Sequence, residues 1–330
     1  MVLSIIIVNW NSQKFVRQCL ASLAKYRPPV EFEAIVVDGA SFDGCDAMLA
    51  REFPWVRYVQ SPTNVGFGRA NNLGARHATG RYLLLLNPDT EFIEDMISTM
   101  LGCMERLPQA GAVGCRLLNA NHTLQTTSTQ SYPTVLNQLL DSEFLRHLFP
   151  RSSLWGMQPL YAEGGQPVEA EAISGACVLL HRERFEAVGG FTDSYFMYGE
   201  DLDLSYKLNR AGYTNYHIPS ARLVHFGGGS SKQAASNFST VMMRESVHRF
   251  MRSNRGAFSA LAYRVTTGAS ALARLVLIFP LMLFGDRIVR HGTGSLRKWK
   301  AVFKWSIGRP AQAAARSSSP ANPPVQANTV

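Results

Sequence analysis

Leu3-Ser4-Ile5-Ile6-Ile7-Val8, followed directly by Asn9-Trp10-Asn11, is the stretch that indicates the fold of this 330-residue chain. A continuous, β-branched apolar run is typical of a strand buried on both faces. The polar residues behind it are typical of the end of such a strand. Residues 13–23 then carry apolar side chains at helical spacing, so the chain is expected to begin with a strand and a helix.

The same alternation of apolar runs and helical patterns continues to residue 117. It predicts an α/β fold with a mostly parallel central sheet flanked by helices on both faces. In such sheets, ligands bind at the carboxyl ends of the strands. The further strands are predicted at Ala34–Val37, Val56–Gln60, Arg81–Leu86 and Ala112–Leu117, and the further helices at Asp46–Glu52, Arg69–His77 and Ile93–Arg106.

Polar residues follow the first four predicted strands. They are Asn9-Trp10-Asn11, Asp38-Gly39-Ala40-Ser41, Asn64-Val65-Gly66 and Asn87-Pro88-Asp89. Any one of them alone is equally well explained as a turn or a helix cap. Their recurrence at the expected ligand-binding edge favours one polar ligand that all of them surround.

The phosphate-binding loops of common nucleotide folds are missing from the sequence. No G-x-G-x-x-G lies between the first strand and the first helix, and no G-x-x-x-x-G-K occurs. A phosphate ligand would therefore need another source of positive charge. A divalent ion held by Asp89 is the candidate.

A second acidic site lies in Tyr198-Gly199-Glu200-Asp201-Leu202-Asp203-Leu204, which places three carboxylates within four positions. Two acidic sites suggest that one carboxylate holds a metal and another moves a proton, as group transfer requires. The alternative is that these acids only stabilise the N-terminus of a following helix.

Composition limits the class of protein. With 46% hydrophobic residues, the chain can bury a large core as one broad domain or two fused halves. Charge is uneven: residues 1–240 carry 19 Lys and Arg against 22 Asp and Glu, whereas residues 241–330 carry 14 against 2. The five cysteines form no CxxC pair, which favours a reducing compartment. The first residues show no basic leader or cleavage site, so export is not expected.

Eight blocks of sequence together resemble the inverting glycosyltransferases of family two, which have the nucleotide-sugar-binding GT-A fold. Within that family, the resemblance is to the bacterial rhamnosyltransferase-like branch, and it covers about residues 3 to 232. The blocks are Ser4–Asn11, Val37–Ser41, Asn64–Asn72, Leu85–Thr90, Ser174–Cys177, Gly189–Phe191, Gly199–Leu204 and Val224–Gly228.

The resemblance implies a donor site and a metal site. Asp89 matches the last acid of a D-x-D-like motif, which binds Mg²⁺ or Mn²⁺ on the donor diphosphate, although Asn87 stands where the first acid would be. His225 could supply a second ligand or be structural, and a mixed oxygen and nitrogen shell would favour Mn²⁺. The implied donor-binding residues are Val8, Asn9, Trp10, Asn11, Asp38, Gly66, Asn71 and Asn87.

The resemblance also implies catalytic roles. Asp201 matches the base that removes the proton of the acceptor hydroxyl, with direct displacement inverting the anomeric carbon. Glu200 would orient the acceptor or tune Asp201, because adjacent carboxylates raise each other's proton affinity. Asp203 would only favour the helix N-terminus. Residues 227–232 are expected to be either a lid that brings Lys232 to phosphate or a solvated linker.

The C-terminal third has different chemistry. Residues 241–265 interleave arginines with apolar residues at helical spacing, and the apolar run Leu275–Gly285 is too short for a span and is divided by Pro280. Basic residues and two tryptophans around this run predict helices that lie in an anionic membrane surface. The alternative is a set of core helices or a homo-oligomer interface. A nucleic-acid partner is not expected, because aliphatic blocks separate the basic residues.

Four segments are expected: a nucleotide-sugar-binding half (1–118), an acceptor-binding and catalytic half (119–236), a basic amphipathic helical region (237–309) and a disordered tail (310–330). The resulting hypothesis is a transferase at the inner face of the cell membrane. It would move a sugar, such as rhamnose from dTDP-rhamnose, onto a glycan or lipid-linked acceptor in cell-surface polysaccharide synthesis. A non-catalytic sugar-nucleotide or glycan-binding module is the alternative, and a nucleotidyltransferase is disfavoured by the missing Gly-rich loop.

Overall fold

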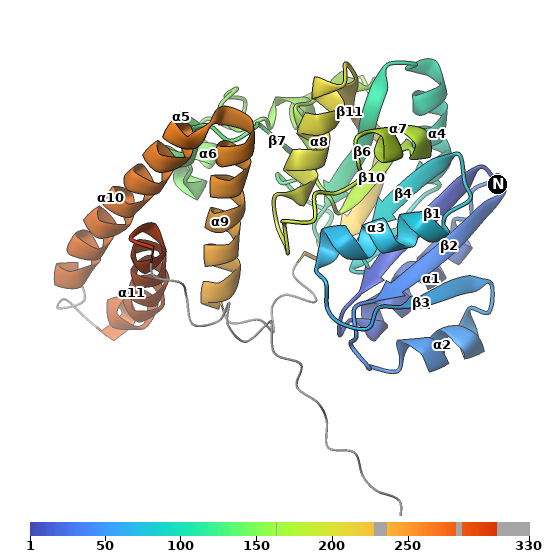
Figure 1. Cartoon of the computed structure of the whole chain (residues 1–330), viewed down its shortest axis with the longest axis horizontal. Helices are drawn as coiled ribbons and strands as arrows, with labels where there is room; N and C mark the ends of the chain where they lie inside the picture. The colour runs from blue at the N-terminus through green and yellow to red at the C-terminus, as the bar shows by residue number, and fades with distance from the viewer. Residues whose placement is uncertain (163, 228–235, 282–285, 309–330) are drawn as a thin grey trace, which may run out of the picture.

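A computed structural model of the chain describes residues 1–162, 164–227, 236–281 and 286–308. Figure 1 shows an α/β body that carries the sheet and, beside it, three long C-terminal helices. The polypeptide passes from the body to these helices after the last strand of the sheet.

A nine-stranded sheet forms the centre of the body, in the order β3-β2-β1-β4-β10-β6-β11-β5, with β8 also paired to β11. Strands β1 to β4, β6 and β11 run in one direction, whereas β5, β8 and β10 run the opposite way. The sheet is therefore mixed and mostly parallel, as predicted. Its strands are β1 (Leu3–Asn9), β2 (Phe32–Asp38), β3 (Val56–Gln60), β4 (Tyr82–Leu86), β5 (Thr90–Phe92), β6 (Ala110–Leu118), β8 (Val168–Glu169), β10 (Cys177–His181) and β11 (Thr214–His225).

Helices cover both faces of the sheet. Residues of α1 (Gln13–Lys25), α2 (Cys45–Glu52) and α4 (Met96–Arg106) share one buried cluster with Ile5 and Ile7 of β1. Ile6 lies in the cluster on the other face. That face is covered by α3 (Phe67–His77), α7 (Arg182–Ala187) and α8 (Glu200–Arg210). Burial on both sides explains why the strands are continuous apolar runs.

Most predicted elements lie within three residues of their predicted bounds. The largest shift is at α4, which was predicted from Ile93 and begins at Met96. Asp95 caps this helix, since its side chain accepts a hydrogen bond from the Ser98 N–H at 3.1 Å. The residues immediately before this cap include β5, whose backbone pairs with β11.

The functional edge of the sheet follows from its topology. Strands β1, β2, β4, β6 and β11 all end at the same edge. Strand β10 runs the other way, so the loop at residues 174–176 that precedes it lies at this edge as well. The antiparallel pairing of β5 with β11 sets Thr90 opposite His225.

The C-terminal helices α9 (Ser236–Arg255), α10 (Ala257–Leu281) and α11 (Asp286–Ser306) pack on one another. Their shared core includes Met251, Tyr263 and Trp305. Phe250 of α9 joins them to the body, because it lies against Tyr132 and Tyr206 with ring centroids 6.1 and 5.3 Å away. Short elements surround this junction: β7 (Thr129–Gln130), α5 (Val135–Leu139), α6 (Glu143–Leu148), the 3₁₀ turn η1 (Gln158–Tyr161) and β9 (Ala172–Ile173).

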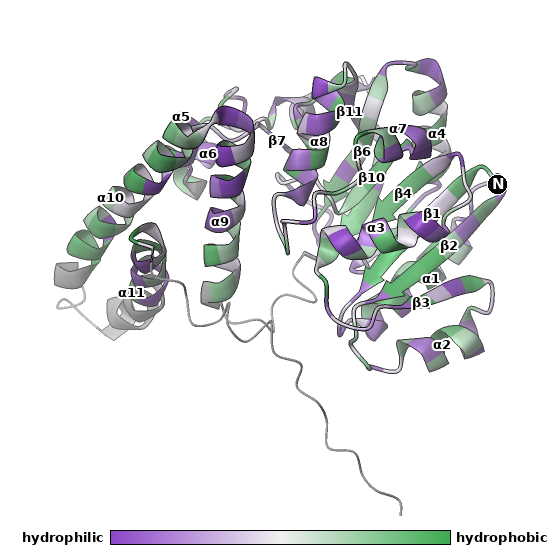
Figure 2. Ribbon diagram, in the orientation of Figure 1, coloured by the Kyte–Doolittle hydropathy of each residue, from purple (hydrophilic) through white to green (hydrophobic). Residues whose placement is uncertain are grey.

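The apolar run that begins at Leu275 belongs to a longer helix. Gly256, with φ of +88°, separates α9 from α10, and α10 then extends from Ala257 to Leu281 with Pro280 in its last turn. Its stretch Ala257–Ile278 is 22 residues long with a mean hydropathy of 1.2, enough to cross a membrane by length and composition. Figure 2 shows hydrophobic residues along much of α10. The expected lid at residues 227–232, apart from Gly227, and the expected tail at 310–330 lie outside the described residues.

Candidate active site

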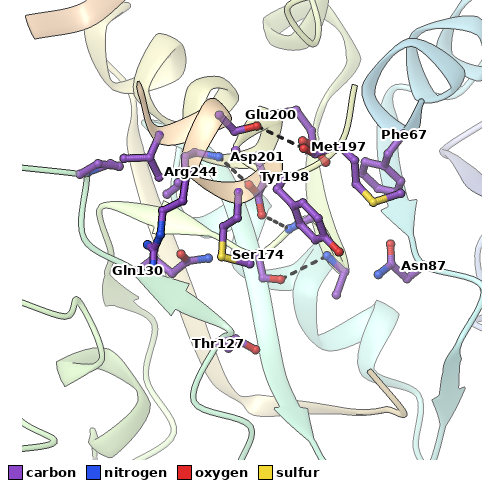
Figure 3. A pocket seen from close by; sticks show the side chains of 18 of the residues that line it. Phe67, Asn87, Thr127, Gln130, Ser174, Met197, Tyr198, Glu200, Asp201 and Arg244 are labelled. Atoms are coloured by element: carbon purple, nitrogen blue, oxygen red, sulfur yellow. Dashed lines mark hydrogen bonds between the residues drawn. The ribbon is translucent and has the colours of Figure 1, made fainter. Parts of the chain in front are cut away.

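A cavity of about 970 Å³ lies at the carboxyl edge of the sheet and extends to the C-terminal helices. Figure 3 shows Asn87, which directly follows β4, Asp201 of α8 and Arg244 of α9 around it. The cavity brings together residues that are far apart in the sequence. The predicted site residues that line it are Val8, Trp10, Gly66, Asn87, Asp89, Glu200, Asp201 and His225.

Asp89 and His225 meet at one corner of this cavity. The His225 Nε2 lies 3.3 Å from the Asp89 Oδ1, and both side chains are largely buried. The β5–β11 pairing holds them there, with an additional hydrogen bond from the Phe226 N–H to the Asp89 carbonyl at 2.9 Å. Among the described residues, no third His, Cys, Asp or Glu completes a cluster with them.

The environment of His225 determines which ring nitrogen faces this corner. Its Nδ1 lies 2.7 Å from the Gln125 Oε1, a carbonyl oxygen that can only accept, so Nδ1 carries the proton. The Gln125 amide is oriented in turn, because its Nε2 donates to the Asn119 Oδ1 and to the His225 carbonyl. The other ring nitrogen, Nε2, therefore faces Asp89, and the Asn87 Nδ2 approaches it to 3.3 Å.

The residues at this corner fit a divalent cation. A carboxylate oxygen and the imidazole Nε2 lie side by side, and the second ring nitrogen is held by a hydrogen bond. This is the arrangement by which proteins orient histidine ligands. With two protein ligands, further coordination positions would be left for ligand oxygens and water. Sequence reasoning missed Gln125, which is 100 residues from His225 and belongs to none of the motifs.

The loop at residues 174–176 links this corner to the second acidic site. The Asn87 N–H donates to the Ala176 carbonyl at 3.0 Å, and the Gly175 N–H donates to the Asp201 Oδ2 at 2.9 Å. One short loop thus contacts the strand end before Asp89 and also the carboxylate of α8. Both acidic sites are therefore held on the same cavity by backbone hydrogen bonds.

The two adjacent carboxyls at the start of α8 are perturbed by burial. Loss of hydration raises the pKa of Asp201, while the N–H groups of Gly175 and Leu202 oppose that rise. Burial first, and the neighbouring Asp201 charge second, raise the pKa of Glu200 to about 8. The Glu200 Oε2 is buried with no hydrogen-bond partner among the described residues. Perturbed carboxyls on a cavity wall are typical of catalytic sites.

A strained turn presents these carboxyls. Tyr198 has φ of +68° and Gly199 has φ of +79°, so two successive left-handed residues precede Glu200. Such conformations cost energy for a residue other than glycine and often occur at functional sites. Asp203 does not line the cavity; it accepts a hydrogen bond from the Thr192 Oγ1 at 2.5 Å and lies 3.7 Å from Lys207.

Four predicted donor-binding residues do not line the cavity: Asn9, Asn11, Asp38 and Asn71. Asn9 and Asp38 are buried and bonded to each other at 2.6 Å, and Asn9 also accepts from Ser12, so they fasten the ends of β1 and β2 together. Asn71 is buried and donates to the Phe67 carbonyl. Asn11 is exposed, with φ of +51°. Their contacts with a donor stay predictions.

Comparison with known proteins identifies relatives over much of the chain. Residues 4–160 match the family model described as glycosyl transferase family 2. The chain is 29% identical over 239 residues to the N-acetylglucosaminyl-diphospho-decaprenol L-rhamnosyltransferase of Mycobacterium tuberculosis, an alignment that covers 68% of this chain and 76% of that protein. It is 25% identical over 236 residues to rhamnosyltransferase WbbL of Escherichia coli K12, covering 67% and 82% of the two chains.

Solved structures share the fold. The mannosyltransferase PcManGT from Pyrobaculum calidifontis, in complex with GDP-Man and Mn²⁺, gives a TM-score of 0.57 at 15% identity and covers 93% of this chain and 86% of its own. GalNAc-T7 with UDP, GalNAc and Mn²⁺ gives 0.58 at 14% identity and covers 96% and 57%. The predicted GT-A fold is confirmed. The predicted resemblance to the glycosyltransferases of family 2, and to rhamnosyltransferases among them, is confirmed as well.

Proposed function

We propose that this glycosyltransferase moves a sugar from a nucleotide-diphosphate donor to a lipid-linked glycan, with inversion at the anomeric carbon and in dependence on a divalent cation. The observation that carries the proposal is that Asp89, His225 and Asp201 line one cavity. The relatives support the acceptor class, since the mycobacterial protein is named for a GlcNAc-diphospho-decaprenol acceptor and L-rhamnose transfer. Rhamnose from dTDP-rhamnose is the proposed donor sugar.

Asp201 is the proposed catalytic base. It would accept the proton of the acceptor hydroxyl while that oxygen bonds to the anomeric carbon and the bond from that carbon to the diphosphate oxygen breaks. The raised pKa of Asp201 makes it a stronger base than an exposed aspartate, and the N–H groups of Gly175 and Leu202 fix its orientation. A single displacement by this route inverts the anomeric configuration.

Asp89 and His225 are the proposed ligands of Mg²⁺ or Mn²⁺ on the donor diphosphate. A cation bound there would stabilise the negative charge that develops on the leaving group. The mixed oxygen and nitrogen donor set favours Mn²⁺, and both solved structures compared above contain that ion. Val8, Trp10, Gly66 and Asn87, which line the same cavity, are the proposed donor contacts.

The C-terminal helices are proposed to lie in the membrane surface at its cytoplasmic face. The outer face of α10 is apolar and exposed, with Phe258 84% and Leu261 59% accessible. Its inner face carries Arg264, which donates to the Ser306 carbonyl of α11. A helix with an apolar exposed face and a half-buried arginine packed on its neighbour suits a position in the membrane interface.

A transfer assay tests the function. Nucleotide sugars are supplied with Mn²⁺ and a short-chain GlcNAc-diphospho-polyprenol, and the anomeric configuration of the product is read by NMR. We expect transfer with inversion that EDTA abolishes, and loss of transfer in Asp89→Ala. The exposed Asp46 of α2 supplies the matched control, Asp46→Ala, which should leave the rate unchanged.

Two outcomes would refute the proposal. Nucleotide-sugar binding without any transfer or hydrolysis would favour a non-catalytic binding module. Turnover that resists both EDTA and Asp89→Ala would remove the metal site from the mechanism.

A further inference from the structure

The wall of the cavity that faces away from the sheet is basic. Arg244 of α9, Arg274 of α10 and Lys298 of α11 all line it, and Arg146 of α6 lies on the same cavity. None of these residues belongs to the motifs that indicated the family. Arg146 is paired with Asp141 at 2.6 Å. For the other three, no ion pair is found among the described residues.

Arg244 and Arg274 interact unfavourably with each other in the absence of an anion. The Arg244 Nε is buried and has no hydrogen-bond partner within the described parts of the chain. Burial, and next the positive charge of Arg244, lower the pKa of Arg274, and the Asp141 carboxylate only partly opposes this. Two guanidinium groups in a partly dehydrated wall repel each other, and an anion bound between them would reverse that cost.

The Arg274 side chain is oriented by an aromatic ring before any ligand binds. The Arg274 guanidinium lies over the Trp299 ring at 4.2 Å, and the Lys298 Nζ lies 5.4 Å from the same ring. Stacking on an aromatic ring orients the planar guanidinium. Figure 3 shows Arg244 extending from α9 into the pocket. Preorganised donors of this kind favour a planar or bidentate oxyanion such as phosphate.

Helix α10, which carries Arg274, also has an exposed apolar outer face. The exposed residues of α10 recur along one face of the helix that carries Arg274. They are Phe258, Leu261, Val265, Leu272, Val276 and Leu277. A ligand that joins a phosphate group to a long hydrocarbon chain could place the first on the arginines and the second along this face.

We propose that Arg244 and Arg274 form an anion site, separate from the Asp89–His225 corner, for the diphosphate of an isoprenoid-linked acceptor. This assignment rests on the proposed function. It extends that function by naming the two residues that recognise the acceptor. The two diphosphates of the reaction would then bind at opposite walls of one cavity: that of the donor near Asp89, and that of the acceptor on the helices.

Binding of farnesyl diphosphate to the full-length protein tests this site without any need for turnover. Titrations are run by calorimetry in EDTA, with farnesol as the ligand that lacks the diphosphate. We expect farnesyl diphosphate to bind more tightly than farnesol, and Arg244→Gln and Arg274→Gln each to weaken its binding by about tenfold or more. Arg252→Gln, an exposed arginine on α9 outside the cavity, is the matched control and should bind like the wild type.

A second ligand separates the two walls. Binding of UDP or dTDP with Mn²⁺ should be unchanged in Arg274→Gln and lost in Asp89→Ala, whereas farnesyl diphosphate binding in EDTA should persist in Asp89→Ala. Arg244→Lys keeps the charge and should show an intermediate loss, and thermal melting of each variant establishes that it is folded. If the variants bind both ligands as expected but the protein transfers no sugar, the anion site is supported and the proposed function is refuted.

Several results would overturn the site. Equal affinities for farnesyl diphosphate and farnesol would remove the need for an anion contact. Equal loss in the arginine variants and in Arg252→Gln would show a general charge effect. If Arg274→Gln also lost nucleotide binding, the basic wall would bind the donor and not the acceptor. Parallel loss of binding to phosphatidylglycerol vesicles would assign it to lipid head groups.

Discussion

The two walls of the cavity are built by different means. On the sheet side, Asp89, His225 and Asp201 are held by strand pairing and by hydrogen bonds from backbone N–H groups. On the helix side, Arg244 and Arg274 lie on helices that pack through a separate apolar core. Sheet register fixes positions closely, as bond-making chemistry requires, whereas a wall of packed helices suits recognition of a large, partly apolar partner.

The largest expected effect is that of Asp201→Asn, which removes the proposed base from the sheet-side wall. The amide keeps the shape of the side chain but cannot take up a proton, so we expect kcat to fall by about 10²- to 10⁴-fold. Binding of the nucleotide with Mn²⁺ should be unaffected. Steady-state kinetics with Asp46→Asn as the control provides the check. Near-normal turnover by Asp201→Asn would require a different base.

Gln125→Leu tests whether Gln125 orients His225 as a ligand of the cation. Without the Oε1 acceptor, the His225 ring loses the bond that fixes its tautomer and orientation. We expect the affinity for Mn²⁺ to fall by about 10- to 100-fold, while saturating Mn²⁺ restores most of the rate. Gln18→Leu, on the exposed side of α1, is the matched control. Unchanged Mn²⁺ affinity in Gln125→Leu would mean that His225 is not a ligand.

Glu200→Gln tests the buried carboxyl pair through stability. The pKa of Glu200 is raised from an ordinary 4.5 to about 8, so the folded protein retains a proton that the unfolded chain releases. Wild-type stability should therefore fall as the pH rises from about 4.5 to about 8. Glu200→Gln lacks this loss, so its melting temperature should exceed that of the wild type by a few degrees near pH 8 and by much less near pH 5.

The melting series is best recorded in EDTA without nucleotide, because a bound ligand would add its own stabilisation. A difference that stays constant across this pH range, or shrinks as the pH rises, would show that Glu200 titrates normally.

The smallest expected effect concerns the outer face of α10. Leu261→Ser with Val265→Ser removes two exposed apolar side chains, 59% and 61% accessible. We expect binding to vesicles that contain anionic lipid to weaken severalfold, with nucleotide binding unchanged. Phe42→Ser, at an exposed aromatic on the body, is the control. Equal vesicle binding by the double variant and the control would place the membrane contact elsewhere.

The parallel strands could be predicted because burial on both faces leaves a continuous apolar run, as in β1 and β4. The polar strand ends were also predicted, but not which of them face the ligand. Asn9 and Asp38 bond to each other inside the protein, whereas Asn87 and Asp89 line the cavity. A pattern of polar residues cannot distinguish these two cases, because both lie at strand ends.

Other parts of the site depend on contacts that leave no local pattern. Gln125 meets His225 across 100 positions of sequence, and only the folded chain brings them together. Arg244 and Arg274 seemed to belong to a basic membrane face, and their place on the cavity follows from how α9 and α10 pack. The apolar run alone did not predict the extent of α10, because the first half of this helix mixes polar and apolar residues.

The central claim is that Asp89 and His225 bind a cation in the cavity that Asp201 also lines. A crystal structure with Mn²⁺ and a nucleoside diphosphate, recorded at a wavelength where manganese scatters anomalously, tests it most directly. The account predicts an anomalous peak within coordinating distance of the Asp89 carboxylate and the His225 Nε2, with the terminal phosphate on the side of Asp201. A peak that neither side chain contacts, or a diphosphate bound outside this cavity, would contradict it.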